Sequence, residues 1–391
     1  MIPLIKSTFF HEKETKEELC KFIKSAKKLS MDKVTSDFEE AFSKYQGRKY
    51  SVFYNSGSSA NLALIQALVN MGRLKQGDNI GFSALTWATN LMPLIQLGLN
   101  PIPIDVSLTN LNVTSEELKK VLLKNKIKCL FITNLLGFCG DINKISKICM
   151  NEGIIFIEDN CESLGSVCNG KKLGNFGLAS TFSFFVGHHI STIEGGMVCT
   201  DDMELYDDLI MVRAHGWTRN VSKNKKESLM KKYTVDNFHD MYTFYVISYN
   251  FRPTEINSFL GLHQLSYLNK MNDIRQSNFK LFSEHVAKNP DFCILDVSHM
   301  DFVSNFAYPL ISKNAKMLDH YKKKFLGNCE IRPIIGGSML EQPFFKEYLT
   351  SKNIAFDCPN SKKIHENGFY FPNNPELTED EKNLIIGLLK K

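Results

Sequence analysis

Short apolar runs rich in β-branched residues alternate with helix-like segments up to about Asp201, and this alternation constrains the fold most. Strands that are apolar throughout are buried on both faces, so the pattern predicts an α/β domain with a mainly parallel sheet. Ligands of such domains gather at the carboxyl ends of the strands. The expected strands are Ser51–Tyr54, Asn79–Phe82, Asn100–Ile104, Lys128–Asn134, Gly153–Glu158, Ser180–Phe185 and Met197–Thr200, and the expected helices are Ser58–Asn70, Ser115–Leu123 and Asp141–Glu152.

The chain is long enough for two domains, since its 391 residues exceed the usual size of one core. We expect a large domain over residues 1–255 and a smaller α+β domain over residues 256–391, entered through one long helix at Thr254–Met271. Before that helix, the lysine-rich stretch Ser222–Glu227 is interpreted as a solvated surface loop. The alternative is a mobile basic loop near a nucleotide diphosphate.

Composition excludes several classes of protein. A net charge of +5 is small for this length, so no nucleic-acid partner is expected. The N-terminal run Met1–Lys6 is too short for a signal peptide, and no apolar run is long enough to span a membrane. The ten cysteines form no CxxC pair, which predicts reduced thiols, a cytoplasmic protein and no metal site.

A Gly/Ser turn, Asn55–Asn61, follows one expected strand and opens a helix. A helix N-terminus offers unpaired N–H groups and a positive dipole end, Gly57 lets the backbone come close, and Ser58 adds a hydroxyl, so the turn can bind a phosphate. The alternative is a plain turn with a serine N-cap.

Polar and aromatic residues follow two further strands. Asp159 ends the strand before Glu162, where its carboxylate can keep a pyridine nitrogen protonated. It can equally be a loop acid that caps the next helix. Trp87 can stack on a flat heterocycle, or belong to the core.

Adjacent histidines follow the strand that ends near Phe185. If that segment is extended, His188 and His189 point to opposite sides, so one faces the cleft and the other packs inside. Further along, His215 ends a helix that it can simply cap, and Arg219 can meet an anionic group or remain solvated.

In combination these motifs resemble the sugar aminotransferases of the DegT/DnrJ/EryC1/StrS family, which have the aspartate-aminotransferase (type I) fold and bind pyridoxal 5'-phosphate (PLP). The resemblance covers nearly the whole chain. A histidine stands where the family has its cofactor lysine. In this respect the chain is similar to the lysine-less branch of the family, the 3-dehydratases. The motifs are Asn55–Leu62, Glu158–Ser163, Ser183–His189, Arg213–Asn220 and Tyr249–Pro253.

The resemblance implies a role for each matching residue. Gly57, Ser58 and Ser183 would hold the cofactor phosphate. Trp87 would stack on the ring, Asp159 would pair with its nitrogen and Glu162 would lie near its hydroxyl. His188 would be the catalytic base. Asn250 would reach the neighbouring subunit's phosphate, His215 and Arg219 would lie near the sugar nucleotide, and Arg332 would contact substrate or glutamate.

The resemblance also implies a reaction. PLP would take an amino group from L-glutamate, giving 2-oxoglutarate and pyridoxamine phosphate (PMP), and a homodimer with shared sites would remove the C3 hydroxyl of a nucleotide-linked 4-keto-6-deoxyhexose. GDP-4-keto-6-deoxy-D-mannose is the expected substrate, and dideoxysugar synthesis for lipopolysaccharide O-antigen the expected pathway. Residues 217–249 contain no cysteine, so no iron–sulfur cluster is expected. Two alternatives are an aminotransferase that uses another lysine, Lys171 or Lys172, and a non-catalytic regulator that binds a sugar nucleotide.

Overall fold

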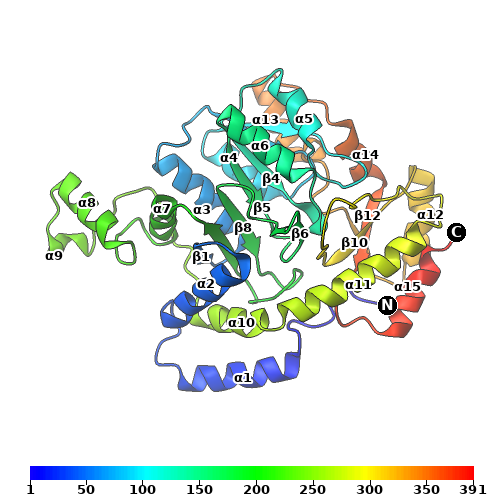
Figure 1. The fold of residues 1–391 in the computed structure, drawn as a ribbon, viewed down its shortest axis with the longest axis horizontal. Helices are drawn as coiled ribbons and strands as arrows, with labels where there is room; N and C mark the ends of the chain where they lie inside the picture. The colour runs from blue at the N-terminus through cyan, green and yellow to red at the C-terminus, as the bar shows by residue number, and fades with distance from the viewer.

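A seven-stranded sheet forms the centre of the computed structural model, which describes residues 1–391 (Figure 1). Only β9 runs antiparallel to its neighbours, so the mainly parallel sheet is confirmed. All seven expected strands are present, with ends that differ by at most two residues. In spatial order the strands are β1 (Tyr50–Tyr54), β9 (Gly196–Thr200), β8 (Ala179–Ser183), β5 (Ile155–Asp159), β4 (Cys129–Thr133), β2 (Asn79–Ser83) and β3 (Asn100–Ile104).

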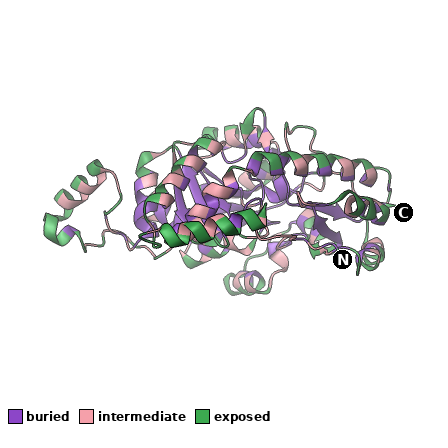
Figure 2. Cartoon of the chain, turned by 90° about the horizontal axis from the view of Figure 1, so that it is seen from below, coloured by how far each residue is buried: buried purple, intermediate pink, exposed green.

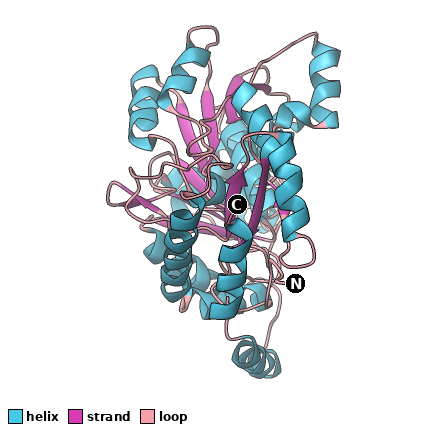
Figure 3. Cartoon of the chain, turned by 90° about the vertical axis from the view of Figure 1, so that its right-hand side faces the viewer, coloured by secondary structure: helices cyan, strands magenta, loops and turns pink.

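Both faces of this sheet are buried (Figure 2). Along β4, Cys129 and Phe131 join one apolar cluster while Leu130 and Ile132 join another, as the two-residue period of a strand requires. Helices pack on both sides (Figure 3). They are α3 (Gly57–Asn70), α4 (Met92–Gln96), α5 (Ser115–Leu122), α6 (Ile142–Glu152) and α7 (Met203–Arg213), with short 3-10 turns η1 (Ala88–Asn90) and η2 (Leu135–Gly137).

Two helices before the sheet, α1 (Glu12–Ser25) and α2 (Lys33–Gln46), were not expected from the sequence. The single helix expected over Thr254–Met271 is wrong. The chain breaks there into α10 (Glu255–Leu265) and α11 (Leu268–Val286). Thr254 starts α10 in a reciprocal capping box with Asn257. A short hairpin, β6 (Val167–Cys168) and β7 (Lys171–Lys172), lies between β5 and β8 in the chain.

A second, three-stranded antiparallel sheet lies at the C-terminal end, in the order β10, β12, β11. The first residues of the chain run beside it, since Ile2 pairs with Cys329. The division at residue 255 stays a prediction. The elements are β10 (Ala307–Ile311), α12 (Ala315–Phe325), β11 (Arg332–Pro333), η3 (Met339–Glu341), α13 (Pro343–Lys352), α14 (Pro359–Asn367), β12 (Gly368–Pro372) and α15 (Glu379–Leu389).

The lysine-rich stretch is a helix, so the expected surface loop is wrong. Together α8 (Lys223–Tyr233) and α9 (Asn237–Asp240) form an arm that projects from the body of the molecule (Figures 1 and 2). No residue of α8 is buried, as expected for a solvated segment. Its lysines bind acids near its base, with Lys225 2.6 Å from Asp208 and Lys226 2.9 Å from Asp240. No helix in the structure combines the length and the apolar character needed to cross a bilayer.

Candidate active site

A cavity of about 450 Å³ opens beside the carboxyl ends of β4, β5 and β8, where the parallel strands predict a ligand. The large sheet, the start of α3 and the small sheet all contribute to its walls. Eight of the eleven expected site residues line it: Gly57, Ser58, Trp87, Asp159, Glu162, Ser183, His188 and Arg332.

The start of α3 forms one end of the cavity. Ser56 caps the helix by accepting a 3.0 Å hydrogen bond from Ser59 N. Gly57 packs so closely on the end of β8 that a Cβ atom there would lie 2.6 Å from Ser183 Cβ. A side chain at this position would therefore push the helix start away from Ser183. The first N–H groups of α3 and the hydroxyls of Ser58 and Ser183 form a cradle suited to a phosphate.

Asp159, the last residue of β5, is held by three donors. Its Oδ2 accepts hydrogen bonds from Asn61 Nδ2 at 3.0 Å and from Asn90 Nδ2 at 2.7 Å. Its Oδ1 accepts a hydrogen bond of 2.8 Å from Cys161 N. This buried carboxylate is therefore fixed in the cavity wall, ready to pair with a cation or a protonated ring nitrogen. It does not cap a helix, so that alternative is excluded.

Glu162 is a buried carboxyl in the same wall. Its Oε2 accepts a 2.9 Å hydrogen bond from Leu136 N, whose backbone is left-handed with φ of 51°. Such a conformation costs about 1–3 kcal/mol in a residue with a side chain, so the surrounding structure enforces it. Burial, together with the nearby Asp159 charge, raises the pKa of Glu162 to about 8. At neutral pH its carboxyl is therefore protonated and can donate a hydrogen bond.

His188 lies in a turn, because its N–H donates to Phe185 O at 2.9 Å, so the extended segment assumed from the sequence is wrong. Its side chain lines the cavity, with the ring 5.5 Å from that of Phe306. Nδ1 is buried with no partner, and burial lowers the pKa of His188 to about 4. The imidazole is therefore neutral at pH 7. His189 instead turns into the protein, where Nε2 bonds Ser304 O at 3.1 Å.

Trp87 and Arg332 enter from opposite parts of the chain. Trp87 is 53% exposed, which leaves an aromatic face open at the cavity. Arg332, in β11, binds Glu330 Oε1 through Nε at 3.0 Å and Nη2 at 2.8 Å. No lysine lines the cavity. The nearest candidates expected from the sequence, Lys171 and Lys172, lie in β7, so the structure does not support another lysine as the cofactor-binding residue.

Three expected residues lie outside this cavity. They gather at the base of the arm. The Arg219 guanidinium lies 3.7 Å from the centre of the Trp217 ring, and the His215 ring is 4.9 Å from that ring. Asn250 is exposed and accepts a 3.0 Å hydrogen bond from Arg252 Nε. The structure thus separates the site residues into a cavity group and an arm group.

The sequence profile of the DegT/DnrJ/EryC1/StrS aminotransferase family matches residues 11–390. The chain is a member of this family. A curated relative, the GDP-4-keto-6-deoxy-D-mannose 3-dehydratase of Yersinia pseudotuberculosis, is 35% identical over 370 residues, which cover 93% of this chain and 92% of that protein.

Solved structures agree with this membership. A histidine-to-asparagine variant of GDP-4-keto-6-deoxymannose-3-dehydratase with bound GDP-perosamine superposes with a TM-score of 0.89, at 32% identity and over 100% of both chains. The same enzyme with a trapped PLP-glutamate geminal diamine gives a TM-score of 0.87 at 32% identity, again over 100% of both chains. The expected aminotransferase fold is confirmed.

Within a DegT/DnrJ/EryC1/StrS member, the cavity group fits PLP. The cradle at Gly57 and Ser183 suits a phosphate, the fixed carboxylate of Asp159 suits a pyridinium nitrogen, and the open face of Trp87 suits a flat ring. His188, whose Nδ1 is buried and unpartnered, lines the same cavity, and no lysine does.

Several residues of this DegT/DnrJ/EryC1/StrS site were missed from the sequence. Asn61 and Asn90 sit inside the motifs that suggested a phosphate turn and a stacking Trp87, but only the fold shows that both amides converge on one carboxylate. Leu4, Phe306 and Tyr370 also line the cavity and have no motif. They reach it because the N-terminal segment and the small sheet fold over its mouth.

Proposed function

We propose that this chain removes the C3 hydroxyl of GDP-4-keto-6-deoxy-D-mannose, using PLP and PMP with L-glutamate as amino donor. The observation that carries the proposal is a neutral, buried imidazole, His188, in a PLP-shaped cavity that no lysine lines. Without that lysine, no side-chain amine can displace an aminated sugar from the cofactor and so release it. Loss of the hydroxyl is therefore favoured over net amination.

Side chains of the cavity would hold the cofactor in place. Gly57, Ser58 and Ser183 would bind its phosphate, Trp87 would stack on its ring and Asp159 would keep the ring nitrogen protonated. When bound, the cofactor supplies a primary amine to the sugar ketone and a conjugated ring that takes up electrons. Protonated Glu162 would donate a hydrogen bond to the ring hydroxyl.

His188 would move the protons. Its neutral ring can accept a proton from carbon, and the resulting imidazolium can then donate that proton to the departing C3 hydroxyl. General acid–base transfer of this kind contributes about 10²–10⁴-fold to a rate. The rings of Phe185 and Phe306 lie next to that of His188, with centroids 6.0 and 5.5 Å away. Arg332, oriented by Glu330, would bind the carboxylate of glutamate or the substrate's diphosphate.

A homodimer with shared sites accounts for the arm group. His215, Arg219 and Asn250 would complete the cavity of the neighbouring subunit. The arm also exposes an unusual set of large apolar side chains, which favours a protein contact. These are Tyr233, Phe238, Met241, Tyr242, Phe244 and Ile247. The ten cysteines are all free, in keeping with a reducing, cytoplasmic compartment.

The test is incubation with PLP, L-glutamate and a panel of GDP-, CDP- and dTDP-linked 4-keto-6-deoxyhexoses, followed by mass spectrometry. We expect the GDP-linked mannose derivative to lose one oxygen atom, with one 2-oxoglutarate and one ammonia formed per turnover. A product that retains nitrogen would mean an aminotransferase. Cofactor binding without turnover of any sugar would contradict the proposal.

A further inference from the structure

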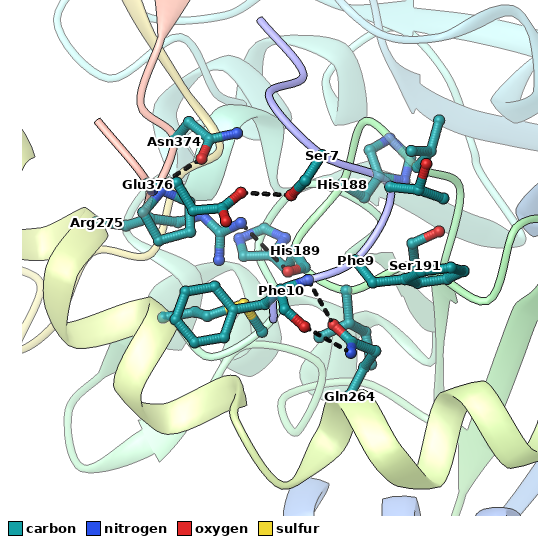
Figure 4. Close-up of a pocket in the computed structure, with 15 residues that line it drawn as sticks. Ser7, Phe9, Phe10, His188, His189, Ser191, Gln264, Arg275, Asn374 and Glu376 are labelled. Atoms are coloured by element: carbon teal, nitrogen blue, oxygen red, sulfur yellow. Dashed lines mark hydrogen bonds between the residues drawn. The ribbon is translucent and has the colours of Figure 1, made fainter. Parts of the chain in front are cut away.

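A second, smaller cavity of about 40 Å³ lies behind the turn that carries His188 and His189 (Figure 4). Its walls come from the N-terminal segment around Ser7, from α11 and from the loop around Glu376. His188 lines both this back cavity and the large one, so it forms part of the partition between them.

Arg275 of α11 points into the back cavity (Figure 4). Only 4% of it is exposed, and its Nη2 donates a 3.2 Å hydrogen bond to the carbonyl oxygen of His189. Its Nε and Nη1 have no protein partner. Burial lowers the pKa of Arg275 to about 10, so the guanidinium is still charged at neutral pH. Glu376, the carboxylate across the cavity, accepts from Ser7 Oγ, and its charge partly offsets this lowering of the pKa of Arg275 without a direct ion pair between them. Buried N–H groups of a charged side chain are destabilising when they lack an acceptor, so Nε and Nη1 need one.

The His189 ring lacks a hydrogen-bond donor, whereas Arg275 lacks acceptors. Its Nε2 bonds the carbonyl oxygen of Ser304, which can only accept, so Nε2 carries the proton and Nδ1 is left as an acceptor. That Nδ1 is buried and has no donor. Burial and the Arg275 charge keep the pKa of His189 well below its usual value, so the ring stays neutral.

The occupant of the cavity must therefore accept hydrogen bonds from Arg275 and donate one to His189. A halide can accept from Arg275 but cannot donate to His189 Nδ1, whereas water does both. One water needs roughly 10–15 Å³ of such volume, so about 40 Å³ holds roughly three or four.

We propose that Arg275 is a positioning residue for His188. Its Nη2 donates directly to the carbonyl oxygen of His189, and ordered water in the back cavity links its remaining N–H groups to Nδ1 of the His189 ring. The backbone that carries His188 is thereby fixed from behind, and a base displaced by about 1 Å loses on the order of 10²-fold in rate. The kinetic consequence rests on the proposed function, while the water site does not.

Kinetics of three variants test the positioning. Arg275→Met keeps much of the shape and removes every N–H, so we expect kcat to fall about 10–100-fold while KM for the sugar changes less than about threefold. Arg275→Lys keeps the charge and one donor group, and should recover part of the loss.

Asn272→Leu is the matched control, because Asn272 is buried in the same helix but bonds Leu164 O and Tyr45 OH instead of the histidine turn. It should lower the melting temperature and leave kcat within about twofold. Equal losses in Asn272→Leu and Arg275→Met, or an unchanged kcat in Arg275→Met, would overturn the positioning role.

Crystallography of the cofactor-loaded protein tests the water site without any turnover. We expect density within about 3.2 Å of both Arg275 Nε or Nη1 and His189 Nδ1. Crystals grown in bromide test for an anion, since an anomalous peak in the cavity would show an anion site and overturn the water bridge. An empty cavity would also overturn it. If wild-type protein failed to dehydrate any sugar while this density was present, the proposed function would fall and the water site would stand.

Discussion

Asn90 donates a 2.7 Å hydrogen bond to Asp159 Oδ2, which joins the short turn after β2 to the carboxyl end of β5. Asn61, in the first turns of α3, donates to the same oxygen at 3.0 Å. Three segments far apart in the sequence thus meet at one carboxylate. Their amides fix its direction, so that it faces the cavity where a ring nitrogen would lie.

Asp159→Asn should leave the fold intact and remove the charge. We expect PLP to bind about 10–100-fold more weakly and the rate of dehydration to fall at least about 10³-fold, because a neutral amide no longer keeps the ring nitrogen protonated. Titration of PLP absorbance measures the binding and mass spectrometry measures the rate. Wild-type turnover by this variant would remove Asp159 from the proposed site.

His188→Asn should bind PLP within about threefold of wild type and lose about 10²–10⁴-fold in dehydration, since it removes only the base. His188→Lys supplies a primary amine. We expect it to bond covalently to PLP, so that borohydride reduction adds the cofactor mass to the chain, and to lose dehydration. Undiminished dehydration in either variant would refute the assigned role.

The raised pKa of Glu162 predicts that activity falls at alkaline pH. Burial raises the pKa of its carboxyl to about 8, so the group is protonated below that pH and loses its proton as the pH rises through it. The proposed hydrogen bond to the ring hydroxyl is lost with that proton. The pH profile of kcat/KM should therefore decline above about pH 8, and Glu162→Gln, which always carries N–H donors, should remove that decline. Identical profiles for the two proteins would show that another group sets the limit.

Gly57→Ala tests the phosphate cradle. The added Cβ would lie 2.6 Å from Ser183 Cβ, so the start of α3 must move away from β8. We expect PLP affinity to drop at least about tenfold. Gly387→Ala, in α15, is the control, because a Cβ there meets no atom within 4 Å, and its PLP affinity should equal that of wild type. A similar affinity in both variants would mean that the cradle does not hold the phosphate.

The sequence predicts the strands well because each central strand is a continuous apolar run, and such runs have one stable place, inside a sheet covered on both sides. Helix ends were less predictable. The Thr254–Met271 pattern is periodic across the break at Ser266, so it predicts one helix where the chain forms α10 and α11. Ser222–Glu227 looked like a loop because its charges carry no apolar face, yet Lys225 and Lys226 stabilise the helix through acids supplied by other segments.

Apart from Arg332, which lies in the small sheet, the cavity group was predictable because its residues follow strands whose carboxyl ends must meet at one edge. Arg275 was not. It lies in the middle of a long helix, with no motif, and only tertiary packing brings it behind the histidine turn. The fold also separated the arm group from the cavity, which no local pattern could indicate, since the Arg213–Asn220 motif lies close to the cavity motifs in the sequence.

Mixed dimers give the sharpest test of shared sites. If Arg219 completes the cavity of the neighbouring subunit, a dimer of one His188→Asn chain and one Arg219→Ala chain carries both defects in one site and none in the other. Each variant alone should be nearly inactive. Co-expressed chains with different tags, purified through both tags, should then recover about half of wild-type activity per dimer, because one of two equivalent sites is intact.

The control pair is His188→Asn with Asp159→Asn, two residues that line the same cavity of one chain. Every site in that mixed dimer keeps one defect, so no recovery is expected. Recovery in the first pair alone means that Arg219 acts across the interface, as we propose for the arm group. If neither pair recovers while both mixed dimers form, Arg219 serves its own chain, and the arm must then fold back over the cavity of its own subunit.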